Sequence, residues 1–525
     1  MNSKDNVTEN LRATGQVTRF YSASIYLLPL LHLIIALPLA YYLNIWMDEG
    51  STLNTTENGF FAALQNTLQA EQQAPLYFWV LGLWRGINGS IFFARIFSII
   101  ASLFAIVVFQ RLARKLWNER VAVGATCLFA IHPYLFWASL EIRVYALLIL
   151  FSLILLTLFI DGYFSVITIV DTEEKVRKFS RITFPIAAVI SLYTNYYLGF
   201  ILVACFLVLL VFKKWREAKT YFLQMLVVGV FFLPLLWAMK IQLAIRNGGY
   251  FPETNPIEGI RLLWGHFLTL TLPTEFFPDE EGGVISAIRL WFVRFAGVFV
   301  LAILIAKRKL FEERNLTFGI FSGVILGFLY FSYFLLGGPM VAVRHVSILF
   351  VPLVLFLISV FVSISPKTKR NRLYYYAFIG ISLSCSYVYA LFSLHPNLTK
   401  TGDWERVGRF IEQNETQNQP IVVFPSFQAM TLPYHYTGKN KILPRERFHE
   451  WFDEAEHGTE GARAKQIEYY ISIFPKESAE VWLLTYDDCQ STKACVPLEK
   501  YVEANYTVVK QKDFYNERVR LLKKK

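Results

Sequence analysis

The chain has 525 residues, of which 55% are hydrophobic and 17% aromatic, and its formal net charge at pH 7 is +11. This composition excludes a soluble multidomain protein of the same length and indicates an integral membrane protein. Nor does the charge indicate a nucleic-acid partner, because the excess of Lys and Arg lies in five short loops between apolar runs. No nucleic acid is therefore expected to bind.

Those five loops carry four Lys or Arg residues each, which makes 20 basic residues against seven acidic ones. They alternate with loops that are poor in Lys and Arg, and the positive-inside rule places such basic loops in the cytoplasm. The amino end is then expected in the cytoplasm as well. The loops cover residues 111–120, 162–182, 213–219, 307–314 and 366–372.

Apolar runs of about 18 to 22 residues predict eleven membrane-spanning helices, because a helix needs about 20 residues to cross the hydrocarbon core. The first, at 24–44, is too long for a signal peptide and lacks a small-residue cleavage site. An odd number of spans places the carboxyl end outside the cytoplasm. The other ten are expected at 92–112, 121–140, 144–161, 183–199, 200–213, 220–240, 286–306, 316–336, 345–364 and 374–394.

Two domains are predicted, a transmembrane catalytic domain at 1–394 and an extracytoplasmic domain at 395–525. In the second domain helical and strand patterns alternate, which favours a small α/β fold. Cys489 and Cys495 lie in this domain, separated by five residues. They are candidates for a disulfide in an oxidising compartment.

Residues 45–90 form the first external loop, which opens with the adjacent carboxylates Asp48 and Glu49 directly after the first span. Apolar residues near 60–68 recur at helical spacing and predict a helix lying in the membrane interface. Placing charged groups close to lipid costs free energy, so such groups are usually functional. The pair could be a general base, a metal ligand or an interfacial cap.

A second polar group, Glu141, Arg143 and Tyr145, stands at the outer junction of the third and fourth spans. The Arg143 guanidinium can bind a phosphate through two parallel hydrogen bonds. The Glu141 carboxylate is a further candidate for a catalytic group. The alternative is a surface ion pair between Glu141 and Arg143 that has no other role.

Two further groups lie on the same predicted face. Tyr193, Asn195 and Tyr196 lie at the outer end of one span, where aromatic residues also belong to the interface belt. Arg344 and His345 open a later span, and the arginine either binds a lipid phosphate or extends to the head groups. Because all these groups fall on one face under a topology drawn from loop charges alone, a site is predicted there.

In their order and sidedness, these stretches resemble the GT-C glycosyltransferases. Within that superfamily they are most similar to glycosyltransferase family 39, which comprises protein mannosyltransferases and aminoarabinose transferases, and to its bacterial relatives. The resemblance covers about residues 20–365. It rests on Asp48-Glu49, Pro75-Leu76-Tyr77-Phe78, Arg95, Glu141-x-Arg143-x-Tyr145, Tyr193-Thr194-x-Tyr196 and Arg344.

The resemblance implies an inverting transfer of a sugar from a polyprenyl-phosphate donor on the non-cytoplasmic face, in a bacterial inner membrane for most relatives with such a tail. It implies Asp48 as the catalytic base with Glu49 beside it, and Glu141 as the residue that orients the acceptor or a donor hydroxyl. Arg143 and Arg344 would neutralise the departing phosphate. The other donor-side candidates are Tyr145, Tyr193, Asn195, Tyr196 and His345.

Several points stay open under this resemblance. The acceptor could be a protein, a glycolipid or a growing glycan. Relatives often have His at the position of Asn195. The asparagine in this chain therefore lacks the proton carrier or metal ligand that a histidine would provide. The eight histidines show no ligand spacing, so no obligatory metal is expected, and a divalent cation on Asp48 or Glu141 is left open. The alternative function is a transporter or flippase, which would place ionisable residues within its spans near the bilayer midplane.

Overall fold

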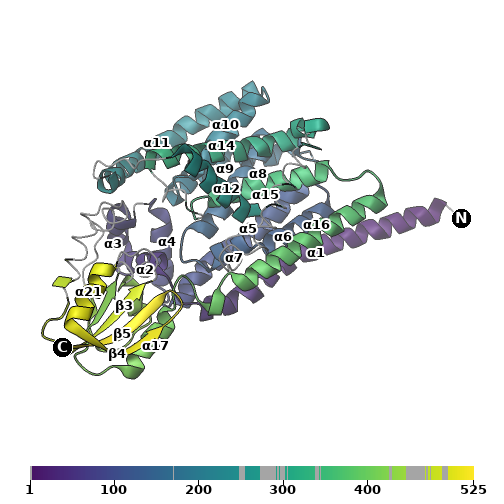
Figure 1. The fold of residues 1–525 in the computed structure, drawn as a ribbon. Helices are drawn as coiled ribbons and strands as arrows, with labels where there is room; N and C mark the ends of the chain where they lie inside the picture. Colours follow the sequence, from purple (N-terminus) through teal and green to yellow (C-terminus); the bar gives the residue numbers. More distant parts are fainter. Residues whose placement is uncertain are drawn as a thin grey trace. The chain divides into compact units, whose positions relative to one another are not determined.

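The chain forms two compact units (Figure 1). The helical unit comprises residues 1–40, 73–84 and 92–394, and the α/β unit comprises residues 41–72, 85–91 and 395–525. The structure is a computed structural model. Apart from a few isolated residues, it describes residues 3–71, 73–169, 171–247, 255–271, 305–336, 344–424, 429–444, 474–486 and 495–525.

The helical unit is built of long apolar helices. Among the described residues, six helices are long and apolar enough to cross a membrane, and α6 with α7 passes the same test as one span bent by 52°. The protein is therefore an integral multi-pass membrane protein. The helices are α1 (Ser3–Tyr42), α4 (Leu76–Arg85), α5 (Ile91–Leu116), α6 (Glu119–Ala130), α7 (Pro133–Leu140), α8 (Tyr145–Tyr163), α9 (Glu174–Thr194), α10 (Leu198–Val211), α11 (Trp215–Asn247), α12 (Pro256–Thr271), α14 (Glu313–Leu336), α15 (Ser347–Ser363) and α16 (Lys369–Ser393).

A helix lies at each predicted span that the structure describes, and the span at 286–306 falls mostly outside the described residues. The neighbouring predictions 183–199 and 200–213 are separate helices, because α9 ends at Thr194 and α10 begins at Leu198. Both α10 and α15 are shorter than a full span. The number of eleven crossings and the orientation in the membrane stay predictions.

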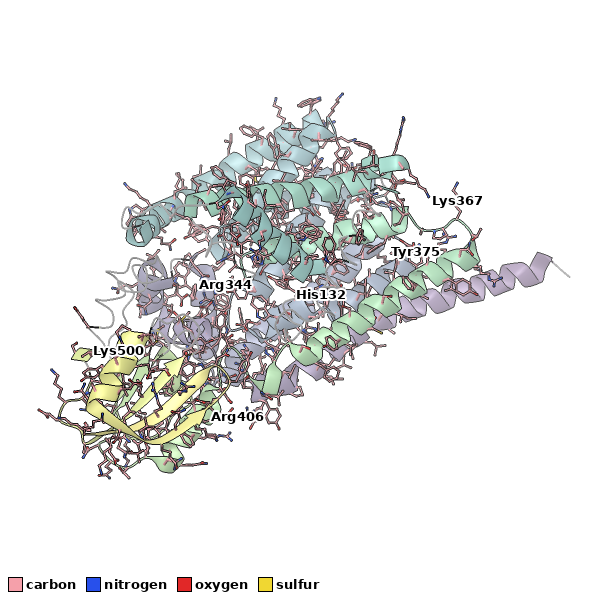
Figure 2. The ribbon with its side chains drawn as sticks, in the orientation of Figure 1. His132, Arg344, Lys367, Tyr375, Arg406 and Lys500 are labelled. Carbon is pink, nitrogen blue, oxygen red and sulfur yellow. The ribbon has the colours of Figure 1, made fainter. Side chains whose placement is uncertain are left out.

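Two histidine side chains stabilise the break between α6 and α7. A break in a helix leaves backbone groups without helical partners, and these groups need other partners inside a membrane. His32 of α1 donates from Nδ1 to the carbonyl oxygen of Ala130 at 2.8 Å. His132 accepts the N–H of Tyr134 on Nδ1 at 3.1 Å, and Pro133 takes the first helical position, where no N–H is required. The break is thus compatible with a buried location (His132 is labelled in Figure 2).

Replacing His132 by alanine is expected to lower the free energy of unfolding by about 0.5–2 kcal/mol beyond the effect of the lost ring, because the first turn of α7 loses its cap. His132→Asn also removes the ring but keeps an acceptor for the Tyr134 N–H. The difference between the two variants in thermal unfolding in detergent therefore isolates the cap. Equal stabilities of the alanine and asparagine variants would contradict it.

The α/β unit contains a five-stranded sheet with the strand order β2-β1-β3-β5-β4. Figure 1 labels β3, β5 and β4 of this sheet. Strand β1 runs parallel to β2 and β3, whereas β5 runs antiparallel to β3 and β4. The strands are β1 (Ile421–Phe424), β2 (Ile442–Leu443), β3 (Glu480–Tyr486), β4 (Tyr506–Asp513) and β5 (Glu517–Lys524), and the α-helices are α2 (Met47–Thr55), α3 (Gly59–Asn66), α17 (Trp404–Asn414) and α21 (Val496–Asn505).

The two faces of this sheet bury separate apolar clusters, because successive strand residues point to opposite sides. Ile421 and Trp482 belong to the cluster that includes residues of α17. Val422 and Leu483 belong to the cluster that includes residues of α21. The predicted small sheet near the carboxyl end is confirmed. Its location outside the membrane stays a prediction.

The first predicted external loop contributes α2 and α3 to the α/β unit. Helix α3 overlaps the expected interfacial helix at 60–68, and Phe61 at its start is 83% exposed. An exposed phenylalanine of this kind suits a lipid interface. Contact of α3 with the membrane remains a prediction.

Candidate functional site

The junction between α7 and α8 buries Glu141, Arg143 and Tyr145, which are 2%, 7% and 5% exposed. Helix α7 ends because Glu141 has extended backbone angles, with φ −87° and ψ 132°. Ser98 of α5 donates its hydroxyl to the Glu141 carbonyl oxygen at 2.7 Å, which satisfies a backbone group at the helix end. Tyr145 stacks on Trp137 with ring centroids 4.8 Å apart. The low exposure of Glu141 and Arg143 argues against a simple solvent-exposed surface pair.

A hydrogen-bonded chain joins α7 to the start of α15. Tyr134 Oη lies 2.6 Å from Ser347 Oγ, and Ser347 donates its hydroxyl to the Arg344 carbonyl oxygen at 2.7 Å. The backbone that carries Arg344, which is labelled in Figure 2, is thereby held against the same short helix that ends at Glu141. Sequence reasoning missed Tyr134 because it lies inside an apolar run.

The turn between α9 and α10 brings another predicted group to this region. Asn195 accepts the N–H of Tyr197 on its side-chain oxygen at 2.9 Å, so it shapes the turn. The Tyr197 ring meets the His345 ring edge-on, with centroids 5.9 Å apart. Two of the predicted groups, one with Asn195 and one with Arg344 and His345, therefore lie together.

Tyr193 and Tyr196 have different partners. Tyr196 donates its hydroxyl to Gln242 at 3.2 Å. Gln242 in turn donates to the carbonyl oxygen of Gln73 at 2.9 Å. Tyr193 donates to the carbonyl oxygen of Phe231 on α11 at 3.0 Å. Both tyrosines thus connect the end of α9 to α11.

Arg95, which the sequence pattern also included, is fully buried in α5. Its Nη1 donates to the carbonyl oxygen of Ala40 near the end of α1 at 3.0 Å. A guanidinium can satisfy several acceptors at once, so it suits the exposed carbonyl groups at a helix end. This contact holds the last turn of α1, just before the segment with the acidic pair.

The acidic pair itself lies in the first turn of α2, in the α/β unit. Asp48 is 8% exposed and Glu49 is fully buried. Glu49 accepts the backbone N–H of Trp46 at 3.4 Å and the Lys400 ammonium at 2.7 Å. The first turn of a helix favours negative charge because its N–H groups point toward it. Glu49 therefore takes part in a helix cap and an ion pair, which the sequence did not indicate.

Within the part of the chain that the structure describes, no group of three or more His, Cys, Asp or Glu residues is placed to hold a metal ion. Cys495 is disulfide-bonded. Its expected partner, Cys489, lies outside the described residues. The pairing of the two therefore stays a prediction.

Comparisons with known proteins find relatives by structure alone. No family model matches the sequence, and no curated protein matches it. The crystal structure of ArnT from Cupriavidus metallidurans bound to undecaprenyl phosphate aligns with a TM-score of 0.52 and 14% identity, over 94% of this chain and 97% of that chain. The apo form of the same protein gives a TM-score of 0.51 over the same shares. An oligosaccharyltransferase from Archaeoglobus fulgidus is more distant, with a TM-score of 0.44, 11% identity and coverage of 89% and 69%. The likeness to ArnT extends over nearly the whole chain and shows a common fold.

Proposed function

We propose that this chain, which has the fold of the GT-C glycosyltransferases, transfers a sugar from a polyprenyl phosphate to an acceptor outside the cytoplasm. The observation that carries the proposal is the burial of Glu141 and Arg143 at a helix junction of a membrane protein. Burying ionised groups is costly and is typical of functional positions in membranes. The ArnT structure of the same fold is bound to undecaprenyl phosphate, which supports a donor of this class.

The proposed reaction needs a base, cations and correct placement of the two substrates. The acceptor hydroxyl attacks the anomeric carbon of the donor, and Asp48 takes its proton. The bond between that carbon and the phosphate oxygen breaks, and its electron pair leaves with the polyprenyl phosphate. Attack opposite the leaving group inverts the configuration of the sugar. General base catalysis of this kind contributes about 10²–10⁴-fold in rate.

Arg143 and Arg344 are proposed to match the charge that the phosphate gains as it leaves. A guanidinium presents a planar fork of donors that fits phosphate oxygens. Tyr145, which follows Arg143 by two residues in the sequence, stacks on Trp137, and this stacking restricts how the segment moves. Glu141 is proposed to hold the acceptor or a donor hydroxyl. In this scheme the residues of the chain itself supply the base and the positive charge, and a divalent cation is an optional addition.

The test is a transfer assay with the full chain in lipid nanodiscs and a panel of polyprenyl-phosphate sugars labelled in the sugar. The expected result is release of free polyprenyl phosphate together with label on a protein, glycolipid or glycan acceptor. The class that receives the label identifies the acceptor. Movement of labelled lipid between the leaflets of vesicles, without release of polyprenyl phosphate from any donor, would instead favour a flippase and contradict the proposal.

A further inference from the structure

Glu49 and Lys400 form an ion pair that is closed off from solvent inside the α/β unit. The Lys400 Nζ lies 2.7 Å from Glu49 Oε1, and the side chains are 2% and 0% exposed. The residues are 351 positions apart in the sequence. The pair therefore joins the first turn of α2, which carries Asp48, to the segment that leads into the C-terminal sheet.

The backbone around Lys400 is held by the same part of the first loop. Asn44 accepts the Lys400 N–H on its side-chain oxygen at 2.7 Å, and its side-chain amide donates to the carbonyl oxygen of Gly402. The Ile45 N–H is donated to Nε2 of His435 at 3.2 Å. These bonds fix the chain on both sides of the ion pair. The turn with the acidic pair is thus fastened to the C-terminal part of the unit by side chains and backbone together.

Glu49 is also fastened to its own helix. Its second oxygen accepts the Trp46 N–H at the start of α2, as in a capping box. With both oxygens engaged, rotation of the Glu49 side chain would break an ion pair and a cap at once. A buried carboxylate that already binds an ammonium is a poor proton acceptor, because protonation would leave the ammonium without its counter-charge.

We propose that Glu49 and Lys400 are positioning residues that hold Asp48, and that Glu49 itself takes no part in proton transfer. This inference rests on the proposed function, in which Asp48 is the base. It assigns the C-terminal domain an indirect part in catalysis, since the ammonium that orders the first turn of α2 comes from that domain. It also separates the roles of two neighbouring carboxylates that the sequence placed together.

The test compares Glu49→Gln, Lys400→Met and the double variant in the transfer assay, with thermal unfolding measured in parallel. Each single variant breaks the buried ion pair and should unfold at lower temperature. The double variant removes both charges and should recover most of that stability. Its kcat should nevertheless fall by roughly 10-fold to 10²-fold because Asp48 is less well placed. Its KM for the donor and the pH dependence of kcat/KM should not change.

Two results would overturn the proposal. If the folded double variant regains the wild-type kcat, the pair is only structural. If the pH dependence of kcat/KM in the double variant no longer shows the fall in rate that protonation of the base causes, Glu49 is itself the proton acceptor. Lys400→Arg, which keeps the charge, should retain more activity than Lys400→Met. The matched control is Arg406→Met, because Arg406 pairs with Asp403 in the same unit but is 51% exposed. Asp48→Asn with the ion pair intact tests the base separately, so the two proposals can fail independently.

Discussion

Asp48→Asn is expected to lower the release of polyprenyl phosphate by roughly 10²-fold or more, at matched amounts of folded protein. An amide keeps the size of the carboxylate but cannot accept the proton of the attacking hydroxyl. The helix itself should not be affected, because the contacts of Glu49 with Trp46 and Lys400 at the start of α2 do not involve the Asp48 side chain. The measurement is a single-turnover assay with labelled donor, which reports the chemical step directly.

The control for this variant is Glu57→Gln, which removes an exposed carboxylate from the same loop. It should leave the rate within a factor of about two, because surface substitutions of this kind have small effects. Equal rates for Asp48→Asn and the wild type would contradict the assignment of the base. In that case Glu49 and Glu141 become the candidates. The pH dependence of kcat/KM in Glu141→Gln decides between them, because Glu49→Gln also breaks the ion pair with Lys400.

Arg344→Gln is expected to slow the transfer by roughly 10²-fold, because the developing charge on the phosphate loses one preorganised donor. The backbone at this position is held through Ser347 and Tyr134, so the substitution should leave the local fold intact. Arg344→Lys should recover part of the rate, since it restores the charge without the fork. Binding of free polyprenyl phosphate, measured by displacement of a labelled donor, should weaken in parallel.

The matched control is Arg370→Gln, at an exposed arginine in a predicted cytoplasmic loop. Its neighbour in the structure is the Tyr374 ring, over which the guanidinium lies at 5.7 Å. Loss of this contact should not affect transfer. If Arg344→Gln binds and turns over the donor like the wild type, the phosphate is held elsewhere, and Arg143 becomes the first candidate to replace.

Much of the fold could be predicted from the sequence because its signals are local. The length of an apolar run decides whether a helix can cross a membrane, and the predicted spans coincide with helices wherever the structure describes them. The alternating patterns near the carboxyl end likewise predicted the small sheet. The GT-C resemblance, drawn from the order of polar groups between spans, is confirmed at the level of the fold.

What the sequence by itself determined was therefore the class of protein, the positions of most helices and a list of candidate residues. The tertiary structure decided which of those residues meet. Glu49 and Lys400 are 351 residues apart, and Tyr134 and Ser347 are 213 apart. Their pairing depends on how whole elements pack, because side-chain contacts at such separations follow from tertiary packing and leave no periodic signal in the sequence. For the same reason only the structure could show that Glu49 forms a buried ion pair with Lys400.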